Sequence, residues 1–234
     1  MCGKGDKGCR VSRGVQIRPS DIPHVYTDGE RLYTENLVPG VAVYGERLVA
    51  QEGVEYRQWD PRRSKLAALL KKGVGVFPFG RRTDVLYLGA AQGTTVSHLS
   101  DICSEGTIYA VEMSRRAFQK LFDLSEKRSN VMPILADAEK PEAYERIVGP
   151  VAALYQDVAQ RDQVGIFRRN LKFLRPGGFG VLMVKARSAD VAAKPRAVYA
   201  RVRRELEAAG IDIVQETELD PFEKDHAAFL VEKG

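Results

Sequence analysis

The sequence is short of cysteine and of long apolar runs, and each shortage excludes a class of protein. Its 234 residues include three cysteines, Cys2, Cys9 and Cys103, too few for the disulfide framework of a small secreted domain. Cys2, Cys9 and the nearby His24 fit no zinc-binding spacing, so we expect free thiols and no metal. No apolar stretch approaches a membrane span, and the first residues lack the apolar core of a signal peptide. We therefore expect a soluble, cytoplasmic protein without a membrane partner.

The stretch that follows the predicted strand at 84–88 lacks two common nucleotide-binding motifs, since it matches neither G-x-G-x-x-G nor a Walker A loop. A strand, a glycine-containing turn and a helix are nevertheless predicted in direct succession over residues 84–103. Gly89 and Gly93 allow the backbone to come close to a ligand, and the predicted helix offers free N–H groups at Thr94 and Thr95. This order of elements places a ligand at the carboxyl end of the strand.

An acidic residue follows at the end of the next predicted strand, residues 107–112. Glu112 is positioned there to accept hydrogen bonds from both hydroxyls of a ribose. A strand–glycine–helix turn alone is common as plain architecture, and the acid makes a nucleoside-containing ligand the better interpretation. A nicotinamide-dependent oxidoreductase would share both features, so this alternative stays open at this point.

The net charge of +5 is unevenly distributed along the chain. Residues 61–83 hold seven basic and no acidic side chains, and residues 161–210 hold twelve basic and four acidic ones. If the two segments face the same side, they form a phosphate-binding surface. The alternative is that they are two solvated helix faces.

Residues 1–60 are predicted to form a small N-terminal β-rich domain, and residues 61–234 a larger α/β domain. In the first part, Asp28-Gly29 is the tight turn of a hairpin between 23–27 and 30–34, and 41–44 and 54–57 are further strands. Met1 to Gly14 is predicted to be a loose arm or edge strand. Asp60 and Pro61 are then predicted to begin a helix that runs to Lys72.

Strands and helices alternate from Asp84 onward, which implies a doubly wound, parallel sheet. The last two strands are joined by a connection too short for a parallel crossover, so the final strand should run antiparallel. The predicted strands are 84–88, 107–112, 131–135, 151–156, 178–185, 211–218 and 226–232, and the predicted helices 94–103, 114–128, 141–147, 162–174 and 195–209.

Such a seven-stranded, mostly parallel sheet resembles the Rossmann-like fold of S-adenosylmethionine-dependent methyltransferases. Six segments resemble the fibrillarin family, which methylates ribose 2′-hydroxyls of rRNA and tRNA under the direction of box C/D guide RNAs. The similarity runs from about Ile22 to the end. Eukaryotic fibrillarins carry a Gly/Arg-rich N-terminal extension that is absent here, so the chain is similar to the archaeal type. The segments are Leu88–Asp101, Arg63–Ala68, Asp137–Ala138, Gln156–Arg161, Val184–Ser188 and Asp225–Ala227.

The resemblance implies S-adenosylmethionine as cofactor, lying across the strand ends. Met113 would pack against the adenine, and Asp137 would accept from its exocyclic amine, with Ala138 beside it. Taken alone, Met113 could be core packing and Asp137 a helix N-cap. The implied cofactor residues are Gly89, Thr94, Thr95, Glu112, Met113, Asp137, Ala138, Asp157, Val158, Ala159 and Gln160.

The resemblance also implies four catalytic residues, Lys65, Asp157, Lys185 and His226. Lys185 is the candidate general base, with a pKa lowered by Lys65 and by partial burial, and with Asp157 orienting it. His226 would orient the ribose or relay the proton. The two lysines could instead bind phosphate, and His226 could be an ordinary strand residue.

Nothing in the chain is predicted to read an RNA sequence, because no recognition helix, zinc finger or base-stacking strand is evident. In the family, the guide RNA selects the target, and a Nop-domain scaffold protein and a kink-turn-binding, ribosomal-protein-like subunit assemble the particle. A nicotinamide-dependent enzyme would not explain Lys65, Asp157 and Lys185. A non-catalytic RNA-binding scaffold that retains a cofactor fold is the alternative from another class.

Overall fold

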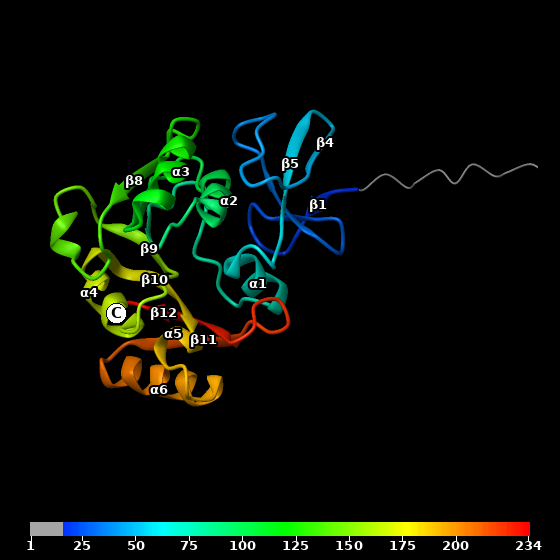
Figure 1. Cartoon of the computed structure of the whole chain (residues 1–234). Coiled ribbons are helices and arrows are strands. Elements are labelled where there is room, and N and C mark those ends of the chain that lie inside the picture. Colours follow the sequence, from blue (N-terminus) through cyan, green and yellow to red (C-terminus); the bar gives the residue numbers. More distant parts are fainter. Residues whose placement is uncertain (1–15) are drawn as a thin grey trace, which may run out of the picture.

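The computed structural model describes residues 16–234 (Figure 1). The predicted arm at 1–14 and the predicted free thiols of Cys2 and Cys9 lie outside the described residues. Cys103 is a free, buried cysteine. Within residues 16–234, no cluster of side chains suited to a metal ion is present. None of the helices in this range has the length and apolar character of a membrane span.

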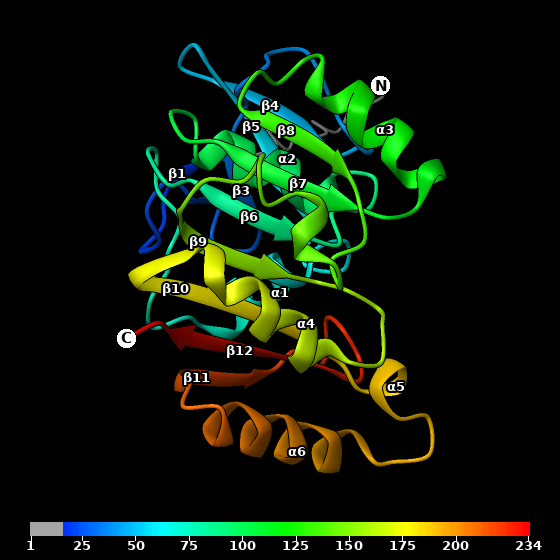
Figure 2. The ribbon, with the colours of Figure 1, turned by 90° about the vertical axis from the view of Figure 1, so that its left-hand side faces the viewer.

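A seven-stranded sheet forms the centre of the larger part of the molecule, in the order β11-β12-β10-β9-β6-β7-β8 (Figure 2). β12 pairs antiparallel with both β10 and β11, and the other neighbours pair in parallel. The predicted fold, six strands in one direction and the last one reversed, is confirmed. The strands are β6 (Val85–Leu88), β7 (Ile108–Glu112), β8 (Val131–Leu135), β9 (Val151–Gln156), β10 (Leu174–Lys185), β11 (Asp212–Glu218) and β12 (His226–Glu232).

Helices cover both faces of this sheet, which is why central strands such as β6 are buried along their whole length. Two hydrophobic cores result, one under α1, α2 and α3 and the other under α4, α5 and α6. Figure 1 shows α1 and α2 on one side of the sheet and α4 and α6 on the other. The helices are α1 (Lys65–Lys72), α2 (Thr94–Ile102), α3 (Arg115–Ser125), α4 (Gln163–Asn170), α5 (Ala186–Ala189) and α6 (Pro195–Ala208), with 3₁₀ turns η1 (Pro141–Ala143) and η2 (Leu171–Phe173).

Several predicted boundaries differ from the structure for local reasons. α1 begins at Lys65 instead of following Asp60, because Ser64 is its N-cap and accepts from the Ala67 amide. The predicted helix 141–147 is reduced to the single turn η1. β10 begins four residues before the predicted 178. α5 directly follows β10 and was not predicted, since four residues give too little periodic pattern.

A smaller sheet of five antiparallel strands, in the order β1-β2-β3-β5-β4, forms the N-terminal part. The predicted hairpin at Asp28-Gly29 is confirmed as β2–β3, with Tyr26 opposite Tyr33. Residues 41–44 are a loop and not the predicted strand, and the strand Leu48–Gln51, which pairs with β5 on the side away from β3, was missed. The strands are β1 (Arg18–Pro19), β2 (Tyr26–Thr27), β3 (Leu32–Glu35), β4 (Leu48–Gln51) and β5 (Val54–Trp59).

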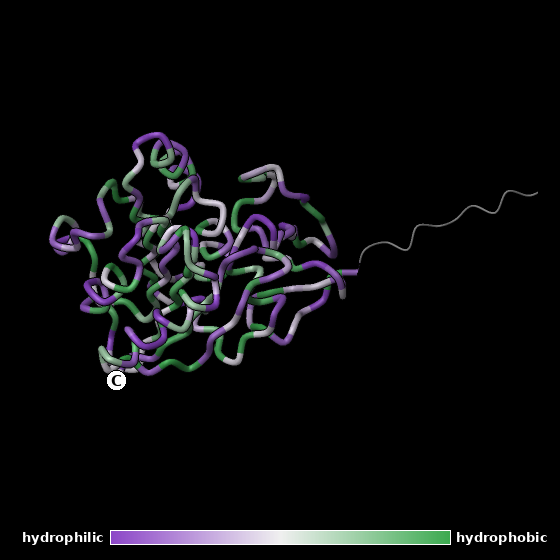
Figure 3. Tube along the Cα trace, turned by 60° about the horizontal axis from the view of Figure 1, so that its bottom comes forward, coloured by the Kyte–Doolittle hydropathy of each residue, from purple (hydrophilic) through white to green (hydrophobic). Residues whose placement is uncertain are grey.

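The small sheet shares a hydrophobic core with the large one. Val25, Leu32 and Trp59 from the small sheet belong to the same buried cluster as Leu66 of α1 and Leu99 of α2. In Figure 3 the hydrophobic stretches lie mostly inside the fold, and the hydrophilic ones mostly on its outer loops. The two parts of the chain are therefore joined by packing as well as by the segment around residue 60.

Buried charges reinforce this junction. Arg57 of β5 contacts Asp101 of α2 at 2.7 Å, and Arg128 contacts the other oxygen of the same carboxylate at 2.6 Å. The Arg57 guanidinium also pairs with Glu46 at 2.6 Å. Because the carboxylate of Asp101 is shared between two guanidinium groups, each buried charge has a partner. The network fixes how the small sheet sits on α2.

The charge totals suggested that the two basic segments, 61–83 and 161–210, could form one positive surface. In the structure, many of their arginines are paired with acidic residues instead. Arg187 pairs with Asp225 at 2.6 Å, Arg196 with Glu218 at 2.9 Å and Arg203 with Glu216 at 2.6 Å. Arg81 and Arg82 both reach Glu105. The acidic partners belong to other segments of the chain. The net charge of each segment therefore could not reveal these pairs.

Candidate active site

The turn after β6 lies very close to the loop that follows β9. Gly89 has a φ of +80°, and a Cβ at this position would lie 2.3 Å from the carbonyl oxygen of Asp157. Only glycine fits both the backbone conformation and that distance. Ala91 also has a positive φ, and Gly93 adopts the left-handed conformation immediately before α2. The turn after β6 is thus pressed against the loop after β9, at the carboxyl ends of two neighbouring strands.

Glu112 ends β7 beside this turn. Its Oε2 accepts from the Ala91 amide at 2.8 Å, and its Oε1 accepts from the Ser114 amide at 2.7 Å. Glu112 as a residue is 8% exposed, and its carboxylate retains lone pairs for a ligand. The two backbone donors hold it in place, so it is a preformed acceptor at the strand end.

A hollow of about 380 Å³ opens above Glu112, and we call it the Glu112 hollow. The Met113 side chain borders it and is 56% exposed, which excludes core packing as its role. Asp137 does not line the hollow, but its Oδ1 accepts from Gln160 Nε2 at 3.0 Å and from the Glu139 amide at 3.0 Å. The predicted cofactor residues that line the hollow are Gly89, Glu112, Met113, Ala138, Asp157, Val158, Ala159 and Gln160.

A second hollow of about 300 Å³ adjoins the first, and we call it the Lys65 hollow. Gly89, Ala91 and Asp157 line both hollows, so the two form one cleft. Lys65, Thr94 and Thr95 line only the second. The Thr95 hydroxyl is 2.9 Å from that of Ser64, which ties the start of α2 to the start of α1.

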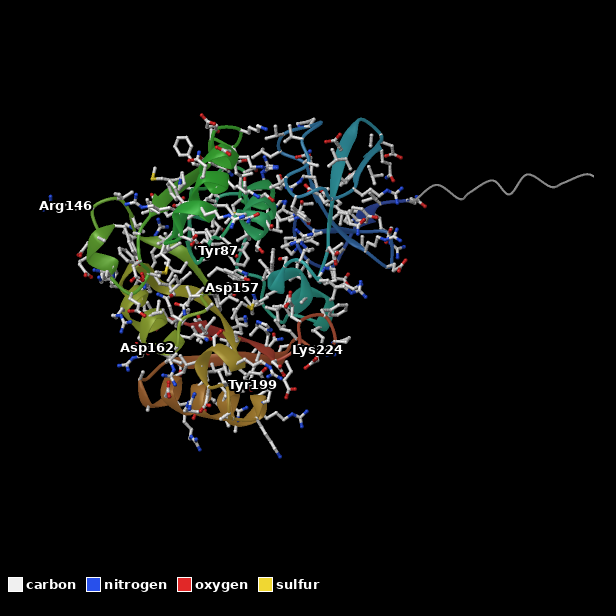
Figure 4. The ribbon with its side chains drawn as sticks, in the orientation of Figure 1. Tyr87, Arg146, Asp157, Asp162, Tyr199 and Lys224 are labelled. Atoms are coloured by element: carbon white, nitrogen blue, oxygen red, sulfur yellow. The ribbon has the colours of Figure 1, made fainter. Side chains whose placement is uncertain are left out.

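An ion pair marks the boundary between the hollows. Lys65 Nζ lies 2.8 Å from Asp157 Oδ2, and both side chains are about one fifth exposed, at 20% and 21%. Lys65 comes from the first turn of α1 and Asp157 from the end of β9. Figure 4 shows Asp157 next to Tyr87 of β6 in the middle of the molecule, and Tyr87 also lines the Lys65 hollow. Burial raises the pKa of Tyr87, so its phenol is neutral.

Lys185 and His226 are cross-strand partners, because β10 and β12 pair with Lys185 opposite His226. Paired residues of an antiparallel ladder project from the same face of the sheet. Lys185 is exposed, and His226 is 8% exposed. Burial and the charges of Lys65 and Lys185 lower the pKa of His226. The charges of Lys65 and Lys185 therefore both act on His226.

The ion pair differs from the predicted arrangement in one respect. Asp157 was expected to orient Lys185, and it pairs with Lys65 instead. Among the described residues, Lys185 Nζ has no carboxylate within 4.0 Å. Lys185 was also expected to be partly buried, and it is exposed. The strand pairing of Lys185 with His226 could be read only from the register of β10 and β12.

Two further residues at this site were not predicted. Burial raises the pKa of Glu223, against the charges of Lys65 and Lys185, and its Oε2 lies 3.9 Å from His226 Nδ1. Gln163 accepts from the Lys185 amide at 3.0 Å and donates to the Lys185 carbonyl at 3.2 Å. Neither residue belongs to a local pattern with a chemical meaning, so sequence reasoning had no signal for them.

Comparison with known proteins agrees with the geometry of this cleft. The fibrillarin family model matches residues 20–234. The chain belongs to the fibrillarin family. A fibrillarin-like rRNA/tRNA 2′-O-methyltransferase of Methanopyrus kandleri is 48% identical over 211 residues, which are 89% of this chain and 91% of that protein.

Two solved fibrillarin structures are similar over nearly their whole length. Aeropyrum pernix fibrillarin, solved with natively bound S-adenosyl-L-methionine, has a TM-score of 0.85 and 44% identity, covering 93% of this chain and 98% of the other. The chain from a fibrillarin/Nop5p complex has a TM-score of 0.82 and 43% identity, covering 90% and 98%. The predicted family and fold are therefore confirmed, and the predicted roles of individual residues stay predictions.

Proposed function

We propose that this fibrillarin-family chain is a ribose 2′-O-methyltransferase that uses S-adenosylmethionine and acts on rRNA and tRNA. The observation that carries the proposal is the Lys65–Asp157 ion pair between two adjoining hollows. One hollow offers a fixed carboxylate and apolar walls to an adenosine, and the other offers charged groups to a ribose. The names of the relatives, which are 2′-O-methyltransferases, support the same activity.

The residues of the Glu112 hollow fit this cofactor. Glu112 would accept from the ribose hydroxyls of the cofactor, Met113 and Ala138 would contact the adenine, and Asp137 would accept from its amine, steadied by Gln160. Thr94, Thr95 and the loop from Asp157 to Gln160 would enclose the methionine part. When bound, the cofactor supplies a methyl group that is already activated on a sulfonium.

The chain must then align a ribose hydroxyl and remove its proton. Lys65 and Asp157 would hold the ribose next to the methionine end of the cleft. Lys185 is exposed at the end of β10. In its neutral form, its amine would take the proton from the 2′-hydroxyl. His226, neutral on the same face of the sheet, would supply a hydrogen-bond acceptor beside the ammonium that results.

The need for partners follows because no element that reads an RNA sequence is predicted from this sequence. Every RNA residue has a 2′-hydroxyl, so the target must be chosen by another molecule. The fibrillarin/Nop5p complex supports a Nop-domain scaffold protein as a partner. We further propose a box C/D guide RNA that pairs with the target and a kink-turn-binding subunit. We place this activity in the cytoplasm.

A labelled-methyl transfer assay on the reconstituted particle tests the activity, and calorimetry tests the cofactor. We expect S-adenosylmethionine to bind and NAD not to bind, and the label to appear on a 2′-oxygen of the target. Binding of NAD alone would support the oxidoreductase alternative. Binding of guide RNA and scaffold without any transfer would support a non-catalytic scaffold.

A further inference from the structure

A third hollow, of about 450 Å³, continues the cleft away from the cofactor side, and we call it the Lys120 groove. One wall is the loop 41–44 of the small sheet, and the other is α3. The groove shares Arg63, Gln92 and Thr94 with the Lys65 hollow. A chain-like ligand whose reacting group lies at Lys65 can therefore extend past these shared residues into the groove.

The charge of the groove is mainly positive. Arg63, Lys120 and Lys127 line it, all three exposed, and Asp123 is its one acidic lining residue. None of the three cations lies within 4.0 Å of a carboxylate in the part of the chain that the structure describes. Many other arginines of this chain, such as Arg196 and Arg203, are paired. The groove is thus a place where cations are left available for an outside anion.

The groove also has a rigid aromatic wall. The Tyr44 hydroxyl is held by His98 Nε2 at 2.8 Å and by the Gln58 carbonyl at 3.1 Å, so its ring position is fixed. Arg63 lies over that ring, 5.4 Å from its centre. Lys120 is in turn held near the mouth of the Lys65 hollow, with its Nζ 3.3 Å from Gln92 Oε1. Two of the three cations are therefore positioned by neighbours before any ligand binds.

We propose that the Lys120 groove binds the ribose-phosphate backbone of the RNA strand next to the methylated nucleotide. The inference rests on the proposed function, because it assigns the neighbouring nucleotides of the same substrate to this groove. Phosphates one nucleotide apart would meet Arg63 first and then Lys120 and Lys127. Contacts of this kind position a strand and read no sequence, which agrees with a target chosen by pairing elsewhere.

The test is the double variant Lys120→Glu/Lys127→Glu in the reconstituted particle. The matched control is Lys194→Glu/Arg204→Glu, which makes the same charge change at the N-cap residue of α6 and within that helix. Lys194 and Arg204 are exposed and, within residues 16–234, form no ion pair. Figure 2 shows α3 and α6 at opposite edges of the large sheet. RNA binding, methyl transfer and cofactor binding are measured separately.

We expect the groove variant to raise the KM for RNA about tenfold or more, with kcat at saturating RNA within about twofold of wild type, since two charge-assisted contacts are lost. The salt dependence of RNA binding should become shallower by about 1.4–1.8 in the log–log slope, for two lost phosphate contacts. The dissociation constant for S-adenosylmethionine should be unchanged, which also shows that the variant is folded. Lys120→Gln/Lys127→Gln should lie between wild type and the Glu variant, and the α6 control should match wild type.

Three outcomes would overturn the inference or separate it from the proposed function. An active particle whose RNA affinity and salt slope are unaffected by the groove variant would show that the RNA does not run here. Loss of binding to the scaffold protein, with RNA affinity intact, would make the groove a protein-docking surface instead. A wild-type particle that binds RNA but transfers no methyl would refute the proposed function. In that case, the salt dependence of RNA binding, compared between wild type and the groove variant, would still show whether RNA binds in the groove.

Discussion

The imidazole of His226 has only one neutral tautomer that suits its surroundings. Its Nδ1 lies 2.6 Å from the carbonyl oxygen of Lys224, and because a carbonyl cannot donate, Nδ1 must carry the proton. Nε2 then holds the lone pair. Figure 4 shows Lys224 on the loop that leads into β12, so the loop and the strand together set the state of the ring. His226 is therefore an acceptor beside Lys185.

Substitution of Lys185 tests whether it takes the proton. Lys185→Ala should lower methyl transfer about 10²–10⁴-fold, the usual loss for a positioned base. Cofactor affinity should change little, because Lys185 lines neither hollow of the cleft. Lys185→Arg keeps the positive charge but cannot accept a proton at workable pH. It should be nearly as inactive as Lys185→Ala in single-turnover assays with saturating RNA. High activity of Lys185→Arg would instead assign Lys185 to phosphate binding and leave His226 as the next candidate.

The pH dependence of the rate tests the neutral state of His226. The pKa of this histidine is lowered by burial and by two lysines, so the folded protein protonates it only below the ordinary value of about 6.5. As the pH falls through that lowered pKa, the ring of His226 becomes positive and can no longer accept a hydrogen bond beside Lys185, so transfer should decrease. The His226→Asn variant, measured over the same pH range, should lack the part of the decrease that His226 causes. An identical acid limb in the variant would contradict the assignment.

The same shift affects stability, with a sign that follows from proton uptake. The unfolded chain binds a proton at a higher pH than folded His226 does, so the free energy of unfolding falls as the pH drops below about 6.5. Buried His98, whose pKa is also lowered by burial, contributes in the same direction. Denaturant unfolding at several pH values, compared between wild type and His226→Asn, separates this effect from the change in rate.

Replacement of Glu112 tests the cofactor site. Glu112→Ala should weaken S-adenosylmethionine binding at least tenfold, since hydrogen bonds to a charged acceptor contribute about 1.5–3 kcal/mol each. Glu112→Gln keeps one acceptor oxygen and should lose less. Glu207→Ala, on an exposed position of α6, removes the same type of charge and should leave affinity unchanged. Calorimetry gives all four dissociation constants, and an unaltered value for Glu112→Ala would make this residue purely structural.

At the scale of the elements, the site depends on how α4 is attached to the end of β10. The Gln163 side chain, 2% exposed, completes the hydrogen bonds of the Lys185 backbone, and Gln156 of β9 donates to the Gln163 carbonyl at 2.7 Å. The loop 157–161 borders the cofactor cleft. Gln156 and Gln163, on either side of this loop, are hydrogen-bonded to each other, and Gln163 is also hydrogen-bonded to Lys185 of β10. A displacement of this loop would move Asp157, one of the proposed catalytic residues.

Removal of the Gln163 side chain should therefore affect turnover more than binding. Gln163→Ala should lower kcat about 10–100-fold, the order of loss expected from a misplacement near 1 Å, with little change in the KM for RNA. Gln163→Glu, which can still accept from the Lys185 amide but cannot donate to its carbonyl, should lose less. The measurements are kcat and the KM for RNA, determined separately by steady-state kinetics, and the melting temperature of each variant. A lower melting temperature with unchanged kcat would make Gln163 only a stabilising residue.

The elements differ in how far they can be predicted from sequence. The order of strands and helices after Asp84 was predictable because buried strands are continuous apolar runs bounded by glycine and proline. The loop at 41–44 was not, because Val41-Ala42-Val43-Tyr44 has the composition of a strand while Glu46 draws its backbone into a turn by accepting from the Val43 and Tyr44 amides. The partner of Asp157 depends on where α1 begins, and Ser64 decides that by capping.

At the scale of the whole molecule, the two sheets cooperate in the proposed site. The small sheet supplies one wall of the Lys120 groove, and its position on α2 is fixed by Arg57, Asp101 and Arg128. Its role could not be predicted, since Arg57 and Asp101 lie 44 residues apart in the sequence and match no motif. The division at residue 60 stays a proposal about domains, and the shared core suggests that neither part is stable alone.

The last prediction concerns the dependence of this molecule on its partners. The purified chain should transfer little methyl to a target RNA, because its exposed cations offer weak, salt-sensitive affinity for any RNA and no element predicted from the sequence selects a nucleotide. Addition of the Nop-domain protein, the guide RNA and the kink-turn-binding subunit should raise both the rate and the selectivity of transfer. The measurement is labelled-methyl transfer to a matched target and to one with a mismatch at the guided position, with components added one at a time. A Lys185→Ala particle, assembled equally well, controls for transfer by contaminants. Efficient transfer to one nucleotide by the chain alone would contradict this dependence and would require a recognition surface within residues 1–234.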